Sequence, residues 1–456
     1  MAGTHLKLEE TGTHPVPGPA RTLSRILDSV MDAGRVILNR RRGNGGIASG
    51  EPDAIAEQCR ELIDHRGEAS GLALASEILG AYQDLPDEGR CYFFELLLRD
   101  FSTNPDTVIQ AAEHYRQLPQ LERLNELRKA IESPRHKLFR RLNQAPGGTS
   151  ALVRMRSDLL GRLHERPELS PIDSDINELL IAWFNRGFLV LERVNWDSSA
   201  RVLEKIIEYE AVHEINGWDD LRGRLRQDRR LFAFFHPAMP DDPVIFIEIA
   251  LGHGGAAAIQ PLLDSGRELL DSSATDTATF YSISNCHRGL QGITFGNFLI
   301  KQVTENLRLD LENIKRFETL SPIRGFRHWM QQAIDDCVAG DGLRDDLETA
   351  SVLLEENRAP DDKTRDACQR LCAHYLVNEK RDGLPLDPAA RFHLSNGAYL
   401  DRINFGADAS DAGNQRSFGM MVNYVYKLSD IEQNHEAYFA DGNVAASGNI
   451  RKLARV

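Results

Sequence analysis

The stretch that decides the fold is residues 278–303, which read Ala278-Thr-Phe-Tyr-Ser-Ile-Ser-Asn-Cys-His-Arg-Gly289-Leu-Gln-Gly292-Ile-Thr-Phe-Gly296-Asn-Phe-Leu-Ile-Lys301-Gln-Val303. Residues 278–284 are β-branched, aromatic and hydroxylated, which is typical of a strand. Three glycines follow, and an amphipathic helix is predicted to begin directly after them. In such a loop the free backbone N–H groups point at one spot, and the dipole of the following helix adds positive potential there. The stretch therefore predicts a strand–loop–helix unit that binds a phosphate group.

The glycine spacing matches neither the Walker motif nor the dinucleotide-binding fingerprint. It resembles instead the pyrophosphate loop of the acyl-CoA-binding GNAT acetyltransferase fold. On this resemblance, backbone N–H groups of the loop are expected to bind the CoA pyrophosphate. The loop residues are Gln291, Gly292, Ile293, Thr294, Phe295, Gly296 and Asn297.

Composition and charge are those of an ordinary soluble globular protein. The chain has 456 residues, of which 41% are hydrophobic and 27% charged, and a formal net charge of −14. This length predicts two or three domains, and the acidic balance argues against a broad nucleic-acid surface. No apolar run reaches the ~18 residues of a membrane span. Six scattered cysteines and the lack of a signal or transit pattern make the cytoplasm the expected location.

Two regions of the chain differ in their periodicity. After a disordered start expected at residues 1–20, residues 21–187 carry apolar residues at three- and four-residue steps, which predicts a helical domain. This region shows no catalytic cluster, so packing or assembly is its expected role. Residues 188–456 alternate strand and helix patterns, which predicts an α+β domain with a mixed sheet and a helical insertion at about 327–390. The expected strands are 187–194, 230–236, 244–251, 278–284, 319–324, 393–400 and 420–426, with further helices at 198–211, 256–269 and 294–309.

Sequence blocks across residues 187–428 resemble, in order, the signature blocks of the malonyl-CoA decarboxylase family. They are Gly187-Phe-Leu-Val-Leu-Glu-Arg-Val194, Glu210-Ala-Val-His213, Phe280-Tyr-Ser-Ile-Ser284, Arg288-Gly-Leu-Gln-Gly292, Phe298-Leu-Ile-Lys-Gln-Val303, Leu320-Ser-Pro-Ile-Arg-Gly-Phe326, Phe392-His-Leu-Ser-Asn-Gly-Ala398 and Asn423-Tyr-Val-Tyr426. The resemblance implies a helical oligomerisation domain, forming a homo-oligomer such as a dimer or tetramer, joined to a GNAT-type catalytic domain. It also implies an enzyme that releases acetyl-CoA and carbon dioxide from malonyl-CoA.

The chemistry of that reaction indicates which residue types it needs. Loss of carbon dioxide from a malonyl thioester leaves an enolate, so catalysis requires hydrogen-bond donors at the thioester oxygen and a proton for the new methyl group. A full cation on the carboxylate would stabilise the ground state, so neutral hydroxyls and amides suit that position better. No metal or cofactor is expected, because the thioester itself accepts the electrons.

The resemblance implies three catalytic residues, which are Ser321, His393 and Tyr426. Ser321 alone would be interpreted as the cap of a Ser-Pro turn, but the family match assigns it to hydrogen-bonding the malonyl head. His393 titrates near the working pH and is expected to protonate the enolate carbon, the alternative being a structural histidine. Tyr426 is expected either to pack in the core or to contact the malonyl group or His393.

Weaker candidates surround these three residues. Lys205 matches a family lysine tied to activity, Arg288 and Gly289 precede the phosphate loop, and Asn396 and Asn423 could orient the substrate through their amides. Thr294 stands where animal members of the family carry an active-site glutamate, so it is given no catalytic role. The Cys368–Cys372 pair with His374 could suggest a metal site, but one helical turn without a second ligand pair favours core packing.

Two rival functions use the same features. An N-acyltransferase would share the CoA loop but needs an acceptor-amine site, and the Ser321–His393 combination fits decarboxylation better. A CoA-sensing interaction protein would bind malonyl-CoA without turnover. The sequence therefore predicts a cofactor-free decarboxylase whose partners are malonyl-CoA and copies of itself, and neither nucleic acid nor membrane.

Overall fold

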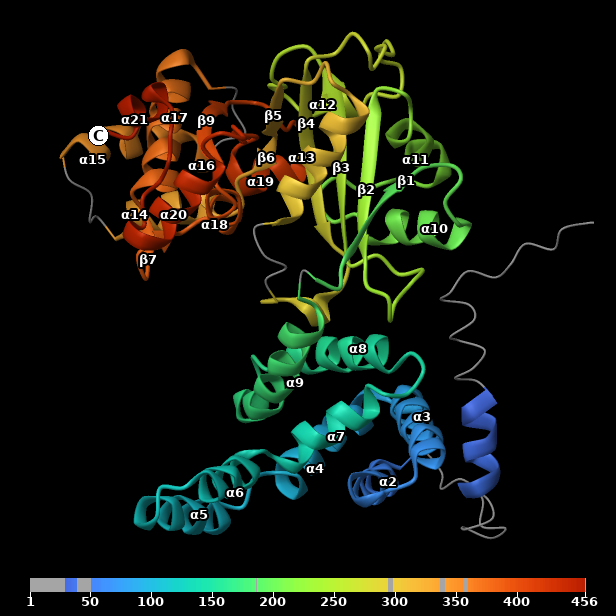
Figure 1. The fold of residues 1–456 in the computed structure, drawn as a ribbon. Helices are drawn as coiled ribbons and strands as arrows, with labels where there is room; N and C mark the ends of the chain where they lie inside the picture. The colour runs from blue at the N-terminus through green and yellow to red at the C-terminus, as the bar shows by residue number, and fades with distance from the viewer. Residues whose placement is uncertain are drawn as a thin grey trace, which may run out of the picture. The chain divides into compact units, whose positions relative to one another are not determined.

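The computed structural model describes residues 29–38, 51–185, 187–293, 298–336, 341–355 and 360–455. The chain forms two compact units (Figure 1). The first unit takes in the chain up to Trp183 together with the short segments 237–240 and 287–293, and the second contains the rest from Phe184 onward.

The first unit is helical, as the sequence predicts. After a helical segment at 29–38, its elements are α2 (Pro52–Asp64), α3 (Glu68–Asp84), α4 (Asp87–Asp100), α5 (Pro105–Gln117), α6 (Leu121–Ile131), α7 (Pro134–Leu142), α8 (Gly148–Leu160) and α9 (Ser170–Trp183), with the 3-10 helices η1 (Pro167–Leu169) and η2 (Arg288–Leu290). Apolar faces of α3, α4, α7 and α8 make the core, with Ile78, Phe93 and Leu138 fully buried. Helices α5 and α6 pack on each other and carry no buried residue.

The second unit is built on a mixed sheet, which confirms the predicted α+β class. Its strands are β1 (Val190–Val194), β2 (Arg229–Phe235), β3 (Ile245–Gly252), β4 (Thr277–Asn285), β5 (Arg316–Thr319), β6 (Ser321–Pro322), β9 (Tyr399–Asn404) and β10 (Met421–Val425), with a separate β7–β8 hairpin (Lys380–Arg381, Leu384–Pro385). The strand order is β1-β2-β3-β4-β5-β10-β6, and β9 pairs with β10. Every pairing is antiparallel except that of β4 with β5.

Helices connect these strands, and those from α14 onward gather mainly into a group beside the sheet (Figure 1). They are α10 (Ala200–Tyr209), α11 (Trp218–Arg224), α12 (Gln260–Leu263), α13 (Phe298–Asp310), α14 (Phe326–Asp335), α15 (Asp341–Ala350), α16 (Val352–Glu355), α17 (Asp362–Val377), α18 (Pro388–Ser395), α19 (Asp411–Ser417), α20 (Ile431–Asp441) and α21 (Gly448–Leu453). Apolar residues of α10, including Ile206, pack on Leu231 and Phe246 of the sheet. In the described part of the chain, no helix has both the length and the apolar character that crossing a membrane requires.

Two local predictions are wrong. The stretch 393–400, predicted as a strand, is the end of helix α18 followed by a turn, and the strand β9 begins only at Tyr399. The helix starts there because Asp387 accepts a hydrogen bond from the Ala390 N–H and Pro388 occupies the first turn, two features that favour a helix N-terminus. The helix predicted at 256–269 is limited to the short α12, since the backbone becomes extended at Asp264.

Candidate active site

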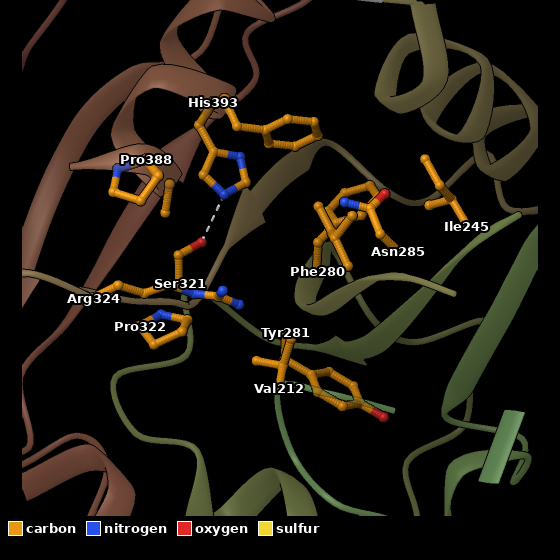
Figure 2. Close-up of a pocket in the computed structure, with 13 residues that line it drawn as sticks. Val212, Ile245, Phe280, Tyr281, Asn285, Ser321, Pro322, Arg324, Pro388 and His393 are labelled. Atoms are coloured by element: carbon orange, nitrogen blue, oxygen red, sulfur yellow. Dashed lines mark hydrogen bonds between the residues drawn. The ribbon is translucent and has the colours of Figure 1, made fainter. Parts of the chain in front are cut away.

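A pocket of about 210 Å³ opens in the second unit, beside the parallel pair of strands (Figure 2). Its lining residues are Val212, Ile245, Phe280, Tyr281, Ile283, Asn285, Ser321, Pro322, Arg324, Pro388, Ala389, Phe392 and His393. Most of the lining side chains are apolar, and among the polar ones Ser321 and His393 point toward each other (Figure 2). An apolar pocket with a few convergent polar groups is the usual form of a small-molecule site.

The pocket exists because β4 and β5 separate. Their pairing runs from Thr277–Arg316 to Phe280–Thr319, and the Leu320 N–H still donates to the Phe280 carbonyl at 2.9 Å. Beyond this point β6 pairs with β10, while β4 continues along β3 to Asn285. The register of β3 against β4 shifts at Glu248/Ile249, so Tyr281 is the extra residue of a β-bulge, which bends a strand locally. Phe280 and Tyr281 consequently both line the pocket.

A chain of hydrogen bonds links two residues that line the pocket, Ser321 and His393, to two that do not, Thr319 and Tyr426. The Tyr426 Oη lies 2.8 Å from His393 Nδ1, and His393 Nε2 lies 2.9 Å from Ser321 Oγ. The Ser321 hydroxyl donates to Thr319 Oγ1 at 2.9 Å. The structure thus brings together all three predicted catalytic residues, although Ser321 and His393 are 72 positions apart in the sequence. It adds Thr319, which the sequence analysis missed.

The hydrogen-bond network assigns the proton of His393 to one of its two ring nitrogens. Ser321 has one hydroxyl hydrogen and donates it to Thr319, so Ser321 Oγ can only accept from His393. A neutral imidazole carries one N–H, which must then be on Nε2. His393 Nδ1 is therefore the acceptor, and the Tyr426 hydroxyl donates to it. The imidazole therefore donates its Nε2–H to Ser321 Oγ, and both residues line the pocket.

Burial keeps His393 neutral. Its side chain is 4% exposed, and desolvation lowers the pKa of the imidazole from 6.5 to about 3. The Tyr424 ring stacks on the imidazole with centroids 4.6 Å apart, which contributes to that burial. Burial also raises the pKa of the Tyr426 phenol, so this group keeps its hydrogen. Near neutral pH the hydrogen-bonded chain from Tyr426 to Thr319 therefore consists of uncharged donors and acceptors.

Asp387 joins the two segments that carry Ser321 and His393. One carboxylate oxygen accepts from the Ala390 N–H at 2.8 Å in α18, and the other accepts from the Arg324 N–H at 3.1 Å, after β6. The side chain is 1% exposed, and burial raises the pKa of its carboxyl. Because one carboxylate binds both backbones, Asp387 holds the serine segment against the histidine helix. The Asp387-Pro388 pair, a common start of a helix, was a signal available in the sequence.

The weaker candidates lie in varied settings. Asn396 caps α18 by donating to the Phe392 carbonyl at 2.7 Å, and Asn423 donates to the Thr319 carbonyl at 2.8 Å. Lys205 pairs with Glu208 at 2.7 Å, and its Nζ lies 4.8 Å from the Tyr209 ring centroid. None of these three side chains is among those that line the pocket.

The predicted phosphate loop is described only in part. Thr294, Phe295, Gly296 and Asn297 lie outside the described residues, whereas Arg288–Ile293 belong to the first unit. There the buried Arg156 donates to the carbonyls of Gly289 at 2.8 Å and Gln291 at 2.9 Å. The Arg288 guanidinium donates to the Leu160 carbonyl at 3.4 Å. Helix α8 therefore fixes the backbone of the segment that leads into the loop.

Gly289 is required by this packing. A Cβ atom at that position would lie 1.9 Å from the Val153 carbonyl oxygen, so Gly289→Ala is expected to destabilise the first unit by about 3 kcal/mol. Gly292→Ala is the matched control, because its φ is +81° but no atom crowds its Cβ, and it should cost about 1 kcal/mol. Thermal denaturation of both variants measures the difference. Equal melting temperatures would show that the close approach to α8 does not matter.

Cys368 and Cys372, the pair considered for a metal site, lie in the core of the second unit. Cys368 and Cys372 are buried in α17, where burial raises the pKa of both thiols, as expected for core packing. Over the described ranges, no three His, Cys, Asp or Glu side chains are grouped so that they could hold a metal ion.

Comparison with known proteins identifies the family of the chain. The family model "Malonyl-CoA decarboxylase C-terminal domain" matches residues 187–456, and the corresponding N-terminal domain model matches 101–184. Mitochondrial malonyl-CoA decarboxylase of Rattus norvegicus is 32% identical over 88% of this chain and 86% of that protein. The protein of the same name from Anser anser anser is 36% identical over 75% of this chain and 74% of that protein.

Solved structures of the same enzyme type share the fold. The crystal structure of malonyl-CoA decarboxylase from Rhodopseudomonas palustris is 44% identical, with a TM-score of 0.83, over 88% of this chain and 99% of that one. The structure from Agrobacterium vitis is also 44% identical, with a TM-score of 0.81, over 88% of this chain and 100% of that one. The chain belongs to the malonyl-CoA decarboxylase family and is a decarboxylating enzyme.

Proposed function

We propose that this enzyme converts malonyl-CoA to acetyl-CoA and carbon dioxide through an enolate that hydrogen bonds stabilise and His393 protonates. The observation that carries the proposal is the Ser321–His393 contact of 2.9 Å in a pocket whose other lining residues are apolar apart from Asn285, Arg324 and the Tyr281 hydroxyl. In a pocket lined mostly by apolar side chains, a hydrogen bond to a developing charge is stronger than in water. The reaction requires no further group, since the thioester carbonyl accepts the electron pair.

The separation of β4 and β5 suits the CoA arm of such a substrate. The Cys286 N–H donates to the Val244 carbonyl, so the backbone groups of alternate residues along β4 are directed to β3. Those of Ile283 and Asn285 are directed to the opposite edge, where the parallel pairing with β5 has ended. An extended chain with amide groups, such as the pantetheine arm, can pair with that edge. We further propose that residues 291–297 hold the pyrophosphate.

The proposed reaction has two steps. First the bond between the carboxylate carbon and the α-carbon breaks, its electron pair moves into the enolate, and carbon dioxide leaves. Ser321 and neighbouring donors hold the malonyl head during this step. Then the α-carbon takes up a proton that His393 supplies. The Ser321 hydroxyl, which accepts from His393 Nε2–H, passes its own hydrogen to the carbon and receives the Nε2 proton in exchange, and the α-carbon becomes the methyl group of acetyl-CoA. A thioester enolate is a stronger base than the deprotonated imidazole, so a neutral histidine can act as the acid, and solvent returns the proton afterwards.

The neutral histidine gives a distinctive pH dependence. Because burial lowers the pKa of His393 to about 3, its protonation state does not change between about pH 5 and 8. The plot of kcat against pH should therefore be flat, with no step near pH 6.5.

The same pKa makes stability depend on pH. The unfolded chain binds a proton at His393 near pH 6.5, whereas the folded chain does not bind it until about pH 3. Stability is therefore lost as the pH falls through this window, by about 1.4 kcal/mol per unit. Steady-state kinetics and thermal melts across this range measure both effects, and a kcat that rises below pH 6.5 would contradict the neutral acid.

Incubation with malonyl-CoA alone tests the function. Formation of acetyl-CoA and carbon dioxide without any amine is the expected result. A requirement for an amine acceptor would favour an acyltransferase, and tight binding without turnover would favour a CoA-sensing protein. Chromatography of the thioesters together with trapping of released carbon dioxide distinguishes the three outcomes.

We also propose that the enzyme self-associates through its helical unit. Four large apolar side chains on or beside α5 and α6 are 48–66% exposed, namely Ile109, Leu118, Leu121 and Ile131. Exposed apolar surface on paired helices that bury no residue of their own is typical of a protein interface. Sedimentation velocity of the full chain measures the oligomeric state.

A further inference from the structure

We propose that Thr319 is a positioning residue of the reaction. Its hydroxyl holds the Ser321 oxygen in place, both when the Ser321 hydrogen is directed to Thr319 and when it is directed to the substrate. This inference rests on the proposed function. Thr319 ends β5, is fully buried, and does not line the pocket. It can therefore influence the substrate only through the residues that it contacts.

Three contacts fix Thr319 itself. Its Oγ1 accepts from Ser321 Oγ at 2.9 Å and from the Tyr424 N–H at 3.2 Å, and its carbonyl accepts from Asn423 Nδ2 at 2.8 Å. Tyr424 and Asn423 both lie in β10, the strand that leads to Tyr426. The hydroxyl is thus anchored to the backbone of a central strand, and a hydroxyl so anchored is a fixed point for Ser321.

Substrate binding must reverse the direction of the hydrogen bond between Ser321 and Thr319. Without substrate, the Ser321 hydrogen is directed to Thr319 and away from the pocket. To bind the malonyl head, Ser321 must turn this hydrogen toward the substrate. The Thr319 hydroxyl can then turn its own hydrogen onto Ser321 Oγ, because a hydroxyl is both donor and acceptor. The oxygen–oxygen separation stays the same while the direction of the bond reverses.

The reversed arrangement favours catalysis. Ser321 Oγ then accepts two hydrogen bonds, one from Thr319 and one from His393 Nε2–H, and donates one to the substrate. Accepted bonds polarise a hydroxyl and strengthen the bond that it donates. Thr319 therefore contributes to the orientation of Ser321 and to its strength as a donor, without touching the substrate.

Substitutions at Thr319 separate this role from simple packing. Thr319→Val removes the hydroxyl, and kcat should fall roughly 10-fold, since one hydrogen bond is lost. KM should stay within about twofold because the side chain lies outside the pocket. Thr319→Ser keeps the hydroxyl and should restore kcat to near the wild-type value. If Thr319→Val does not fold, Thr319→Cys, with its weaker donor, should give an intermediate kcat.

A double-mutant cycle tests whether Thr319 acts through Ser321. In a Ser321→Ala background, Thr319→Val is expected to cause no further loss of kcat, because the partner of the hydroxyl is gone. If the two losses multiply, the positioning role is wrong. This outcome is distinct from failure of the proposed function, in which the wild-type enzyme itself would release no carbon dioxide from malonyl-CoA.

Ser417→Ala controls for lost stability. Thr319→Val also leaves the buried Tyr424 N–H without its acceptor, which should lower the melting temperature. Ser417 is equally buried and donates to the Met420 carbonyl at 2.7 Å just before β10, away from the hydrogen-bond chain. Its alanine variant should show a similar loss of melting temperature with unchanged kcat. A matching loss of kcat in this control would overturn the inference.

Discussion

Replacing His393 with glutamine is expected to lower kcat by about 10³-fold while changing the affinity for the CoA moiety little. An amide can still donate to Ser321 across the 2.9 Å contact, but it is not an acid that can release its proton to a carbon. The expected size of this loss of kcat follows from the usual contribution of general acid catalysis, which is about 10²- to 10⁴-fold. Steady-state kinetics give kcat, and calorimetric titration with acetyl-CoA gives the affinity.

His374→Gln is the matched control for this variant. His374 is a partly buried histidine in α17 whose ring lies 3.2 Å from Glu379, so the same substitution there disturbs packing without touching the pocket. Its kcat should stay close to that of the wild type. Equal losses of kcat and acetyl-CoA affinity in the His393 variant would show that the residue shapes the pocket and does not supply the proton.

The residues that could be predicted from the sequence are those whose signal is local or shared with a family. Strands β3 and β4 were predictable because long runs of β-branched and aromatic residues have few alternatives in a buried sheet. Ser321, His393 and Tyr426 came from short blocks that resemble the family, and the structure places them in one hydrogen-bonded chain. Their order within that chain, and the tautomer of His393, depend on distances that no spacing in the sequence contains.

The missed features depend on tertiary contacts or on a competing local signal. The sequence around His393 has the aromatic and apolar residues of a strand, but the cap at Asp387 and the proline after it start a helix instead. Thr319 has no motif of its own, and its role follows from a contact with Ser321 and a β10 backbone N–H. Asp387 binds Arg324, which is 63 positions away. Contacts of this kind are decided by the fold and not by local propensity.

Ser321→Ala is expected to lower kcat by about 10²-fold and to raise KM only a few-fold. Removing one donor to a developing oxyanion or head group costs about 10²- to 10³-fold in comparable sites. The variant should keep its fold, because Ser321 lies in the two-residue strand β6 and its backbone pairing with Val422 does not involve the side chain. The loss should fall mainly on kcat if the contact tightens as the carboxylate leaves. Kinetics with malonyl-CoA measure both constants.

Ser395→Ala controls for the loss of a hydroxyl near the site. Ser395 lies two residues after His393 on the same helix. Its hydroxyl donates to the Phe392 carbonyl at 3.0 Å and not to any of the hydrogen-bonded residues from Tyr426 to Thr319. Its kcat should be unchanged.

Ser321 has a second role to exclude, since a serine beside a histidine can also act as a nucleophile. Decarboxylation needs no covalent intermediate, so mass spectrometry of the quenched wild-type reaction should find no acyl group on Ser321. An acylated Ser321, or a Ser321→Ala variant with full kcat, would contradict its role as a hydrogen-bond donor to the malonyl head.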